Sequence, residues 1–359
     1  MIRVLFESSI FLHQKVGGIS KYITTLDKYL SNYNVSSKIF SPITVNYYLD
    51  NKKKNIYYFK FKRIPRFCRK IFFFINNFLT AFYIVIKKPD ILHLSYYNNA
   101  LIKFLNIPYI ITVYDLTHEK INSPQREFKK KNLLDKAFHI ICISEQTKKD
   151  LKRFYNIHEK KITVIYLGSE KKKFKVKKHK EKFILHVGSR DKYKNFQSLV
   201  EAFSQSKYLK NNFKLVCFGG GDFKKEEFKL FEKLGVGNRI RNIKGNDFEL
   251  EKFYKKANLF VSLSEHEGFG LTLLEAMKFG CPVVCSDIPV FREVYNNSCI
   301  YVKPKSINDI KKNIENILKS KVKQKKIILN SKKIVNKFSW EKCALDTSKV
   351  YQKILAYEK

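Results

Sequence analysis

The stretch Ser264–Gly280, SEHEGFGLTLLEAMKFG, decides the fold of this chain. The apolar run before it, 258–263, is typical of a buried strand, and 271–279 has the spacing of a helix that ends at a glycine. Pro282 then opens a second apolar run, PVVCS. The order predicts a strand, a ligand-binding loop, a helix and another strand. This alternation is typical of a parallel α/β sheet.

Two glutamates of this stretch lie on either side of the predicted helix start. Glu275 falls about one turn inside the helix, where a half-buried carboxylate is costly unless it accepts hydrogen bonds. The vicinal hydroxyls of a ribose would supply them. Glu267 lies in the loop beside the backbone N–H groups of Phe269 and Gly270, where it could hold a hexose hydroxyl. The E-x7-E spacing is common by itself, but the frame S-x-x-E-G-F-G to L-E-A-M is not.

The rest of the chain repeats the alternation of strand and helix. A length of 359 residues exceeds one ordinary core and predicts two domains of roughly 150 to 200 residues each. We expect strands at 2–7, 37–40, 56–59, 91–94, 109–114, 139–143 and 162–166, then at 183–187, 213–218, 239–243, 258–263, 282–285 and 299–302. We divide the chain into a first domain 1–170, a basic linker 171–182, a second domain 183–337 and a C-terminal helix 338–359 that crosses back to the first domain.

Glycines and cations follow several of these strands, at the sheet edge where open α/β folds bind ligands. Arg190 and Lys194 come after the strand 183–187 and could neutralise a diphosphate, although a basic residue is common in this chain. The turn Gly219-Gly220-Gly221 would let a ligand approach the backbone, or is simply a tight turn. Gly17-Gly18 precedes a helix over 20–30, with Ser20 as the expected N-cap, and could hold an anion.

The charge of +39 has two readings. The first is attraction to a polyanion or an anionic membrane. The second is a bias in residue usage, because Lys, Asn, Ile, Phe and Tyr are abundant throughout. The lysines are dispersed and no nucleic-acid motif is present. The seven cysteines are an odd number, and several of them lie within apolar runs, which predicts buried thiols in a reducing compartment. The first residues enter a strand at once, so we expect no signal peptide and a cytoplasmic protein.

One segment, 71–86 (IFFFINNFLTAFYIVI), is strongly apolar and has basic flanks. Its 16 residues and central Asn76-Asn77 fall short of the about 20 apolar residues of a spanning helix. Two interpretations remain open. The segment is a buried helix that leads into the strand 91–94, or it is a basic, aromatic helix on the surface of an anionic membrane leaflet.

These motifs together resemble those of retaining family 4 glycosyltransferases with the GT-B fold, whose signature is the E-G-F-G to L-E-A-M segment with its two glutamates. The resemblance extends over nearly the whole chain, through 17–22, 112–119, 143–148, 187–195 and 338–341. Within the family the chain is similar to bacterial mannosyltransferases of O-antigen and capsule assembly. The resemblance implies an α/β protein with two Rossmann-like, doubly wound domains that face each other across a cleft.

The resemblance also implies a role for each site residue. A nucleotide-sugar donor would be held by Glu275 at the ribose, by Arg190 and Lys194 at the diphosphate, and by Glu267 with the amides of Phe269 and Gly270 at the transferred sugar. The amides of Gly17 and Gly18 would close over the phosphates. The family usually has His where this chain has Tyr114, which can donate a hydrogen bond but cannot become a cation near neutral pH. Asp115 or His118 could share that role.

The implied reaction moves a hexosyl group, mannosyl from GDP-mannose, to a hydroxyl of a lipid-linked oligosaccharide with retention at the anomeric carbon. No D-x-D pair occurs in the sequence, so we expect no metal cofactor. A nucleotide-sugar epimerase or a phosphorylase would share the architecture, and a non-enzymatic polyanion-binding protein would share the charge. We expect a cytoplasmic enzyme, peripheral on the inner face of the membrane, with no nucleic-acid partner.

Overall fold

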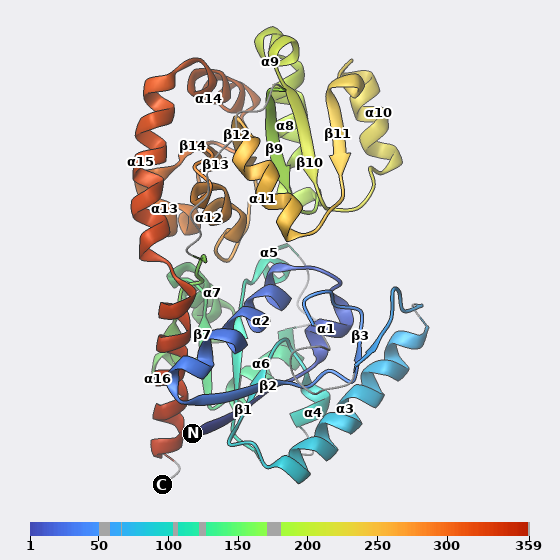
Figure 1. Cartoon of the computed structure of the whole chain (residues 1–359), viewed down its shortest axis with the longest axis vertical. Helices are drawn as coiled ribbons and strands as arrows, with labels where there is room; N and C mark the ends of the chain where they lie inside the picture. Colours follow the sequence, from blue (N-terminus) through green and yellow to red (C-terminus); the bar gives the residue numbers. More distant parts are fainter. Residues whose placement is uncertain (50–57, 66, 103–106, 122–126, 171–180, 358–359) are drawn as a thin grey trace. The chain divides into compact units, whose positions relative to one another are not determined.

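The computed structural model describes residues 1–49, 58–65, 67–102, 107–121, 127–170 and 181–357, and Figure 1 shows the whole chain. The described chain divides into two compact units. Unit 1 is Met1–Gly168 together with Trp340–Lys359, and unit 2 is Ser169–Ser339. Most of the predicted basic linker, 171–180, lies outside the described residues.

Unit 1 is built on a six-stranded parallel sheet in the order β2-β1-β5-β6-β7-β8. The strands 91–94, 109–113 and 139–142 of this sheet are mostly apolar and fully buried, as expected for strands covered on both faces. Two short strands, β3 and β4, form a separate parallel pair. The strands are β1 (Ile2–Phe6), β2 (Val35–Ile39), β3 (Ile43–Thr44), β4 (Phe59–Lys60), β5 (Ile91–Leu94), β6 (Tyr109–Val113), β7 (His139–Cys142) and β8 (Ile162–Val164).

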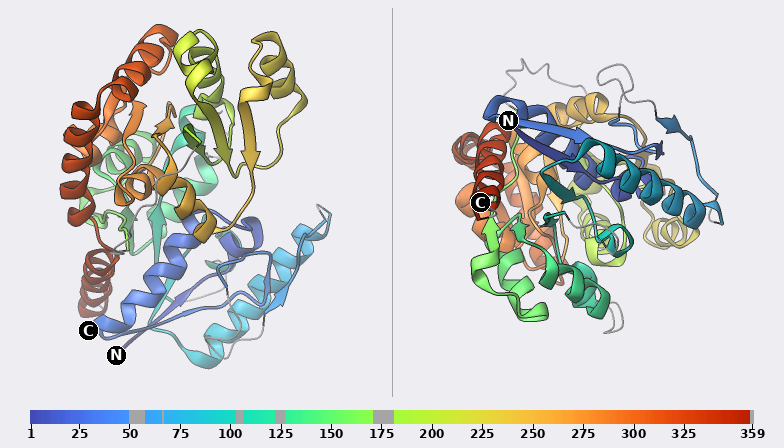
Figure 2. Two further views of the ribbon diagram at one scale, coloured as in Figure 1. Left: turned by 45° about the horizontal axis from the view of Figure 1, so that its top comes forward. Right: turned by 90° about the horizontal axis from the view of Figure 1, so that it is seen from below.

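The helices of unit 1 include the last helix of the chain. That helix, α16, packs beside α2, and Tyr22 and Trp340 lie 6.1 Å apart between ring centroids. Figures 1 and 2 show the two helices next to each other. The helices are α1 (Ser9–His13), α2 (Gly18–Leu30), α3 (Cys68–Lys87), α4 (Asn99–Ile102), α5 (Thr117–Ile121), α6 (Glu127–Lys136), α7 (Glu145–Tyr155) and α16 (Trp340–Tyr357), with 3-10 turns η1 (Ser31–Tyr33) and η3 (Glu159–Lys161).

Unit 2 repeats the same architecture, with a parallel sheet in the order β11-β10-β9-β12-β13-β14. This order reverses direction between β9 and β12, which is where doubly wound sheets bind ligands. The strands are β9 (Phe183–Val187), β10 (Lys214–Phe218), β11 (Ile240–Ile243), β12 (Leu259–Ser262), β13 (Val283–Ser286) and β14 (Ile300–Val302). The helices are α8 (Phe196–Ser204), α9 (Lys207–Asn212), α10 (Lys225–Lys233), α11 (Asp247–Lys256), α12 (Leu271–Lys278), α13 (Pro289–Tyr295), α14 (Ile307–Lys319) and α15 (Lys321–Lys337), with 3-10 turns η4 (Lys192–Lys194), η5 (Gly237–Arg239) and η6 (Asn296–Ser298). The predicted pair of Rossmann-like sheets is confirmed.

The apolar segment that we predicted at 71–86 is longer and more exposed in the structure than a buried helix of that segment would be. It forms α3, a helix of 20 residues rather than 16, and within the described part of the chain it is the one helix long and apolar enough to cross a membrane. Only 17% of its most apolar stretch is buried. The interpretation of this segment as a buried helix is therefore wrong, because one face of the helix exposes large apolar side chains by more than half. These are Ile71, Phe74, Phe78, Phe82, Val85 and Ile86.

Candidate active site

The loop between β12 and α12 begins the site in unit 2. Gly270, the N-cap of α12, has a positive φ of 84°, and a Cβ at this position would lie 2.5 Å from Cε1 of Phe291. Only glycine fits such a position without strain. The side chain of Phe269 is 2% exposed and packs in the interior. The segment E-G-F-G is thus a rigid turn that delivers Glu267 to the carboxyl edge of the sheet.

Glu267 is paired with Lys194. The Nζ of Lys194 donates to Oε1 of Glu267 at 2.6 Å, and each side chain is about one-fifth exposed. Lys194 lies in η4, directly after β9, and the neighbouring strands β9 and β12 bring their two loops together. The backbone N–H of Glu265 also donates to the carbonyl of Tyr193 at 2.8 Å. Lys194, predicted to bind the diphosphate of a donor, and Glu267, predicted to bind its sugar, therefore lie side by side.

Glu275 lies in α12 and is held by a residue that sequence reasoning missed. The hydroxyl of Tyr254, from α11, donates to Oε2 of Glu275 at 3.1 Å. Tyr254 is 1% exposed, and burial, followed by the charge of Glu275, raises its pKa well above the usual value. It therefore remains a neutral donor at any physiological pH. No motif surrounds Tyr254 in the sequence, so nothing there could have signalled this contact.

Arg190 is engaged within the protein. Its Nε donates to Oε1 of Glu227 at 2.6 Å, and its Nη atoms donate to carbonyls of the glycine turn 219–222 at 2.9–3.2 Å. The guanidinium lies 4.8 Å from the ring centroid of Phe223, and the side chain is 4% exposed. Arg190 thus braces the turn. A role for Arg190 at a diphosphate, which would require it to exchange some of these contacts, stays a prediction.

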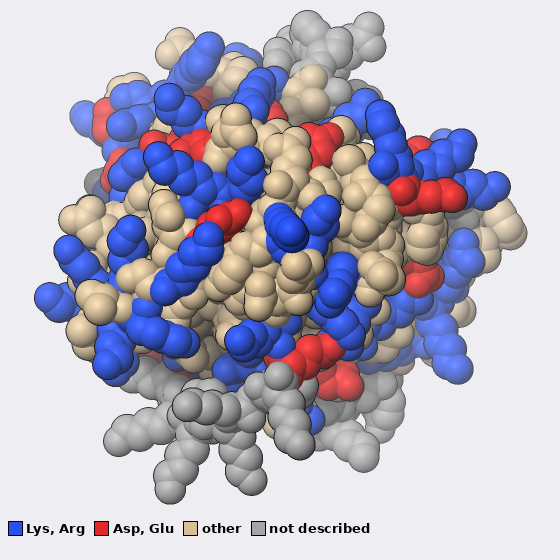
Figure 3. Space-filling view, turned by 90° about the horizontal axis from the view of Figure 1, so that it is seen from above, with Lys and Arg blue, Asp and Glu red and all other residues tan. Residues whose placement is uncertain are grey.

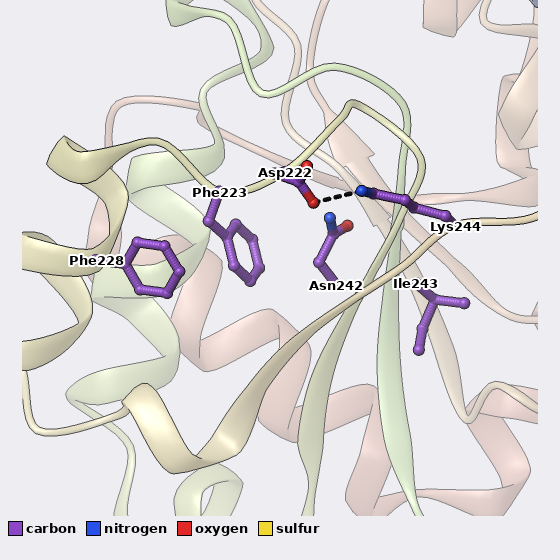
Figure 4. Close-up of a pocket in the computed structure, with 6 residues that line it drawn as sticks. All are labelled: Asp222, Phe223, Phe228, Asn242, Ile243 and Lys244. Carbon is purple, nitrogen blue, oxygen red and sulfur yellow. Dashed lines mark ion pairs between the residues drawn. The ribbon is translucent and has the colours of Figure 1, made fainter.

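The braced turn needs glycine at its centre. Gly220 has a φ of 71°, and a Cβ there would lie 2.3 Å from the carbonyl oxygen of Gly188. Beyond the turn lies a pocket between the ends of β10 and β11, with the Asp222–Lys244 ion pair of 2.6 Å on its rim (Figure 4). Its lining residues are Asp222, Phe223, Phe228, Asn242, Ile243 and Lys244.

In unit 1, Gly17 rather than Ser20 is the N-cap of α2. Ser20 lies inside the first turn, where its hydroxyl donates to the carbonyl of Gly17 at 3.1 Å. The helix therefore starts earlier than predicted, and no side chain caps its first N–H groups. A Cβ on Gly17 would lie 2.3 Å from Oε1 of Gln14, whereas Gly18 has open space. This arrangement suits an anion at the helix start, although that role stays a prediction.

Tyr114 and Asp115 follow β6 and have different surroundings. Tyr114 is 8% exposed, packs edge-on against Tyr22 at 5.5 Å between centroids, and its hydroxyl has no hydrogen-bond partner among the described residues. Burial raises its pKa well above the usual value, so it stays neutral. Asp115 is exposed, and its Oδ1 accepts from the N–H of Thr117 at 2.9 Å, while His118 is also exposed.

Glu7, at the end of β1, is a second residue that we missed. It is fully buried, and its carboxylate accepts hydrogen bonds from the backbone or side chains of Ser9, Ser95, Tyr96 and Asn98 at 2.7–3.3 Å. Such a network offsets the cost of burying the charge. Its place directly after the first strand was a signal in the sequence. Within the described ranges, no group of three His, Cys, Asp or Glu residues is arranged to hold a metal ion.

Both parallel-sheet units carry acids and glycines at the carboxyl edge of their strands, and unit 2 adds Lys194 and Arg190 there. This edge is where open α/β sheets bind ligands. Residues 16–170 match the family described as Glycosyltransferase Family 4, and residues 168–334 match the family described as Glycosyl transferases group 1. The chain therefore belongs to the family 4 glycosyltransferases and is an enzyme with the GT-B fold.

The chain is similar to the O-antigen chain mannosyltransferase RfbU of Salmonella typhimurium, with 34% identity over 184 residues, which cover 50% of this chain and 51% of the relative. It is 28% identical to an uncharacterised glycosyltransferase of Methanocaldococcus jannaschii over 99% of both chains. A solved sucrose-phosphate synthase from Thermosynechococcus elongatus shares the fold, with a TM-score of 0.81 and 19% identity, over 99% of this chain and 100% of that one. The match to RfbU thus spans about half the length of that relative.

Proposed function

We propose that the enzyme transfers a hexosyl group from a nucleotide-sugar donor to a sugar hydroxyl on a lipid-linked oligosaccharide, during synthesis of O-antigen or capsule. The observation that carries the proposal is the pairing of Lys194 with Glu267 beside the Tyr254–Glu275 contact, at the carboxyl edge of one sheet. A cation, a loop carboxylate and a helix carboxylate match the three parts of such a donor, namely diphosphate, sugar and ribose. The name of the Salmonella relative supports mannosyl, from GDP-mannose.

In the proposed complex the donor takes the place of contacts that the site residues make with one another. The diphosphate takes Nζ of Lys194, and Glu267, released from the lysine, accepts hydrogen bonds from sugar hydroxyls. Glu275, oriented by Tyr254, accepts from the two ribose hydroxyls. A cation at the leaving diphosphate stabilises the charge that develops as the glycosidic bond breaks.

The proposed stereochemical course is retention by a front-face reaction. The bond from the anomeric carbon to the diphosphate oxygen breaks, the acceptor oxygen bonds to the same face, and the departing phosphate takes the acceptor's proton. The protein then supplies positioning and charge neutralisation rather than a nucleophile. We propose that no divalent metal takes part. Activity that persists in EDTA is expected, whereas full loss restored by manganese would contradict this part.

A thermal-shift screen against nucleotide sugars tests the donor. A ligand at about 100 times its Kd stabilises the folded state by about 2.7 kcal/mol. Because GDP-mannose is the proposed donor, it should raise the melting temperature more than UDP-glucose at the same concentration. Glu275→Gln should abolish the shift, and Glu232→Gln, an exposed glutamate on α10, should leave it unchanged. Equal shifts in both variants would contradict the assignment of Glu275.

Product analysis separates the proposed transferase from the alternatives. Mass spectrometry of a reaction with GDP-mannose and a lipid-linked acceptor should show an acceptor longer by one hexose. An altered free nucleotide sugar would indicate an epimerase, and a free sugar phosphate a phosphorylase. The polyanion-binding alternative is not favoured, since the many lysines and arginines on the face shown in Figure 3 are scattered, with fewer acids between them, rather than gathered in one patch.

A further inference from the structure

The outward face of α3 carries a continuous apolar stripe. Ile71, Phe74, Phe78, Phe82 and Val85 recur at steps of three and four residues and are 58–70% exposed. This spacing places them on one face of a helix, over a length of about 20 Å at 1.5 Å per residue. In Figures 1 and 2 the helix lies on the outer side of its unit. We call these five residues the α3 stripe.

The inward face of α3 carries buried polar side chains at its centre, beside apolar side chains such as Ile84 and Phe72 that pack against the core of unit 1. Asn76 is 1% exposed, and its side chain both accepts from the N–H and donates to the carbonyl of Ile43 in β3, each at 2.9 Å. The amide of Asn77 accepts from Nδ2 of Asn98 at 2.7 Å, and Thr80 is fully buried. These hydrogen bonds fix the rotation of the helix. The α3 stripe cannot turn inward without leaving buried backbone groups of β3 unsatisfied.

Both ends of α3 are basic. Lys62, Arg63, Arg69 and Lys70 before or at its start, and Lys87 with Lys88 at its end, are all exposed, and the sequence from 51 to 89 contains no Asp or Glu. Phe59, 73% exposed, adds a further apolar side chain from β4. An apolar face with basic side chains at both ends, and no acidic ones between, complements a bilayer with acidic headgroups.

We infer that the α3 stripe and its basic ends form a membrane-docking surface, with α3 lying in the plane of an anionic bilayer and its phenylalanines in the boundary between headgroups and acyl chains. The helix does not span the bilayer, because the hydrogen bonds of Asn76 to Ile43 hold the inward face of α3 against the protein. Pairing with a second copy is disfavoured, since a two-fold contact would bring basic ends against basic ends. The membrane-docking surface itself does not depend on the proposed function. Only its suggested purpose, which is to bring the enzyme to a lipid-linked acceptor, rests on that function.

Sedimentation of the full chain with vesicles tests the inference without donor or acceptor. Binding to phosphatidylcholine vesicles that contain phosphatidylglycerol, and weak binding to phosphatidylcholine alone, are expected. Phe74→Ser, Phe78→Ser and Phe82→Ser together should lower the partition coefficient by at least about a hundredfold, at roughly tenfold for each phenylalanine that half-inserts. The matched control is Phe228→Ser, Phe248→Ser and Leu329→Ser in unit 2, which are 58–66% exposed and should leave binding unchanged.

A second set of variants tests the charges. Arg69→Gln, Lys70→Gln and Lys87→Gln should each weaken binding about fivefold, at roughly 1 kcal/mol per cation near the surface. Exposed lysines of α15 provide the control, and Lys321→Gln, Lys323→Gln and Lys325→Gln should have a much smaller effect. Equal losses in the two sets would show nonspecific attraction by the whole chain and would overturn the docking surface.

Two further experiments distinguish an in-plane helix from a spanning one, and a membrane from a second copy of the chain. Release of the bound protein by alkaline carbonate agrees with an in-plane helix, and retention would overturn it in favour of a spanning one. A dimer in solution that the three serine substitutions on the α3 stripe dissociate, with no binding to vesicles, would assign the surface to a second copy. Donor-induced thermal shifts do not involve α3, so vesicle binding and donor binding can fail independently.

Discussion

Replacing Tyr254 by Phe tests whether Glu275 needs an orienting partner. The change removes one hydroxyl from a side chain that is 1% exposed and leaves its ring packing in place, including the ring contacts with Phe260 and Phe279. A hydrogen bond to a charged group contributes about 1.5–3 kcal/mol. Because this hydrogen bond is 3.1 Å long and its acceptor, Glu275, is half-buried, we expect its contribution to lie at the lower end of this range.

The expected result is a rise of about tenfold in the donor KM, which corresponds to roughly 1.4 kcal/mol, with kcat changed by less than about twofold. KM should rise without kcat because the ribose, the proposed partner of Glu275, is bound equally in the ground state and the transition state. The assay is initial-rate kinetics with varied GDP-mannose at saturating acceptor, with unfolding followed in parallel.

The control is Tyr301→Phe, which removes a hydroxyl that donates to the backbone carbonyls of Phe291 and Asn296 in the same unit. It should cost stability of similar size, about 1 kcal/mol, without changing KM. If Tyr254→Phe destabilises unit 2 but leaves the donor KM within twofold of the original, Tyr254 is only structural and the reasoning fails.

Three other predictions concern stability. Burial lowers the pKa of His93 to about 3, so the unfolded chain takes up a proton near pH 6.5 that the folded chain does not. His93 should therefore lower the free energy of unfolding by up to roughly 1.4 kcal/mol per pH unit below about pH 6.5, in addition to the effect of His139 and His186, whose pKa values are lowered to about 4. Urea midpoints for His93→Gln should show a shallower slope. Gly220→Ala should destabilise unit 2 by several kcal/mol more than Gly221→Ala, because both have positive φ but only the first places its Cβ 2.3 Å from a backbone oxygen; equal melting temperatures would disprove the steric argument. Asn76→Leu should cost about 2–5 kcal/mol in unit 1, since two buried backbone groups of β3 lose their partner, and a loss under about 1 kcal/mol in chemical denaturation would show that α3 is not fixed as described.

The sequence alone determined the architecture and the outline of the site. Alternating apolar runs and helical spacing identify both parallel sheets, because periodicity depends only on the local chain. The same local reasoning places Glu267 in a loop after β12, Glu275 one turn into α12 and Lys194 after β9. Parallel strands end at one edge, so these residues had to share it.

Only the tertiary structure decided which side chains meet there. Lys194 reaches Glu267 because β9 and β12 are neighbours, and Tyr254 reaches Glu275 across two helices. Arg190, expected at a phosphate, is held by Glu227 and the glycine turn. Such contacts join residues from separate elements, and no local pattern encodes the distance between them.

The helix α3 shows the same limit most clearly. Its sequence gives an apolar helix with two central asparagines, and a buried position would ordinarily follow from that composition. The structure turns Asn76 inward because β3 offers an N–H and a carbonyl that need partners. Phe74, Phe78 and Phe82 face outward as a consequence. Periodicity fixes which residues share a face of a helix, whereas the partners that another element presents decide which face is inside.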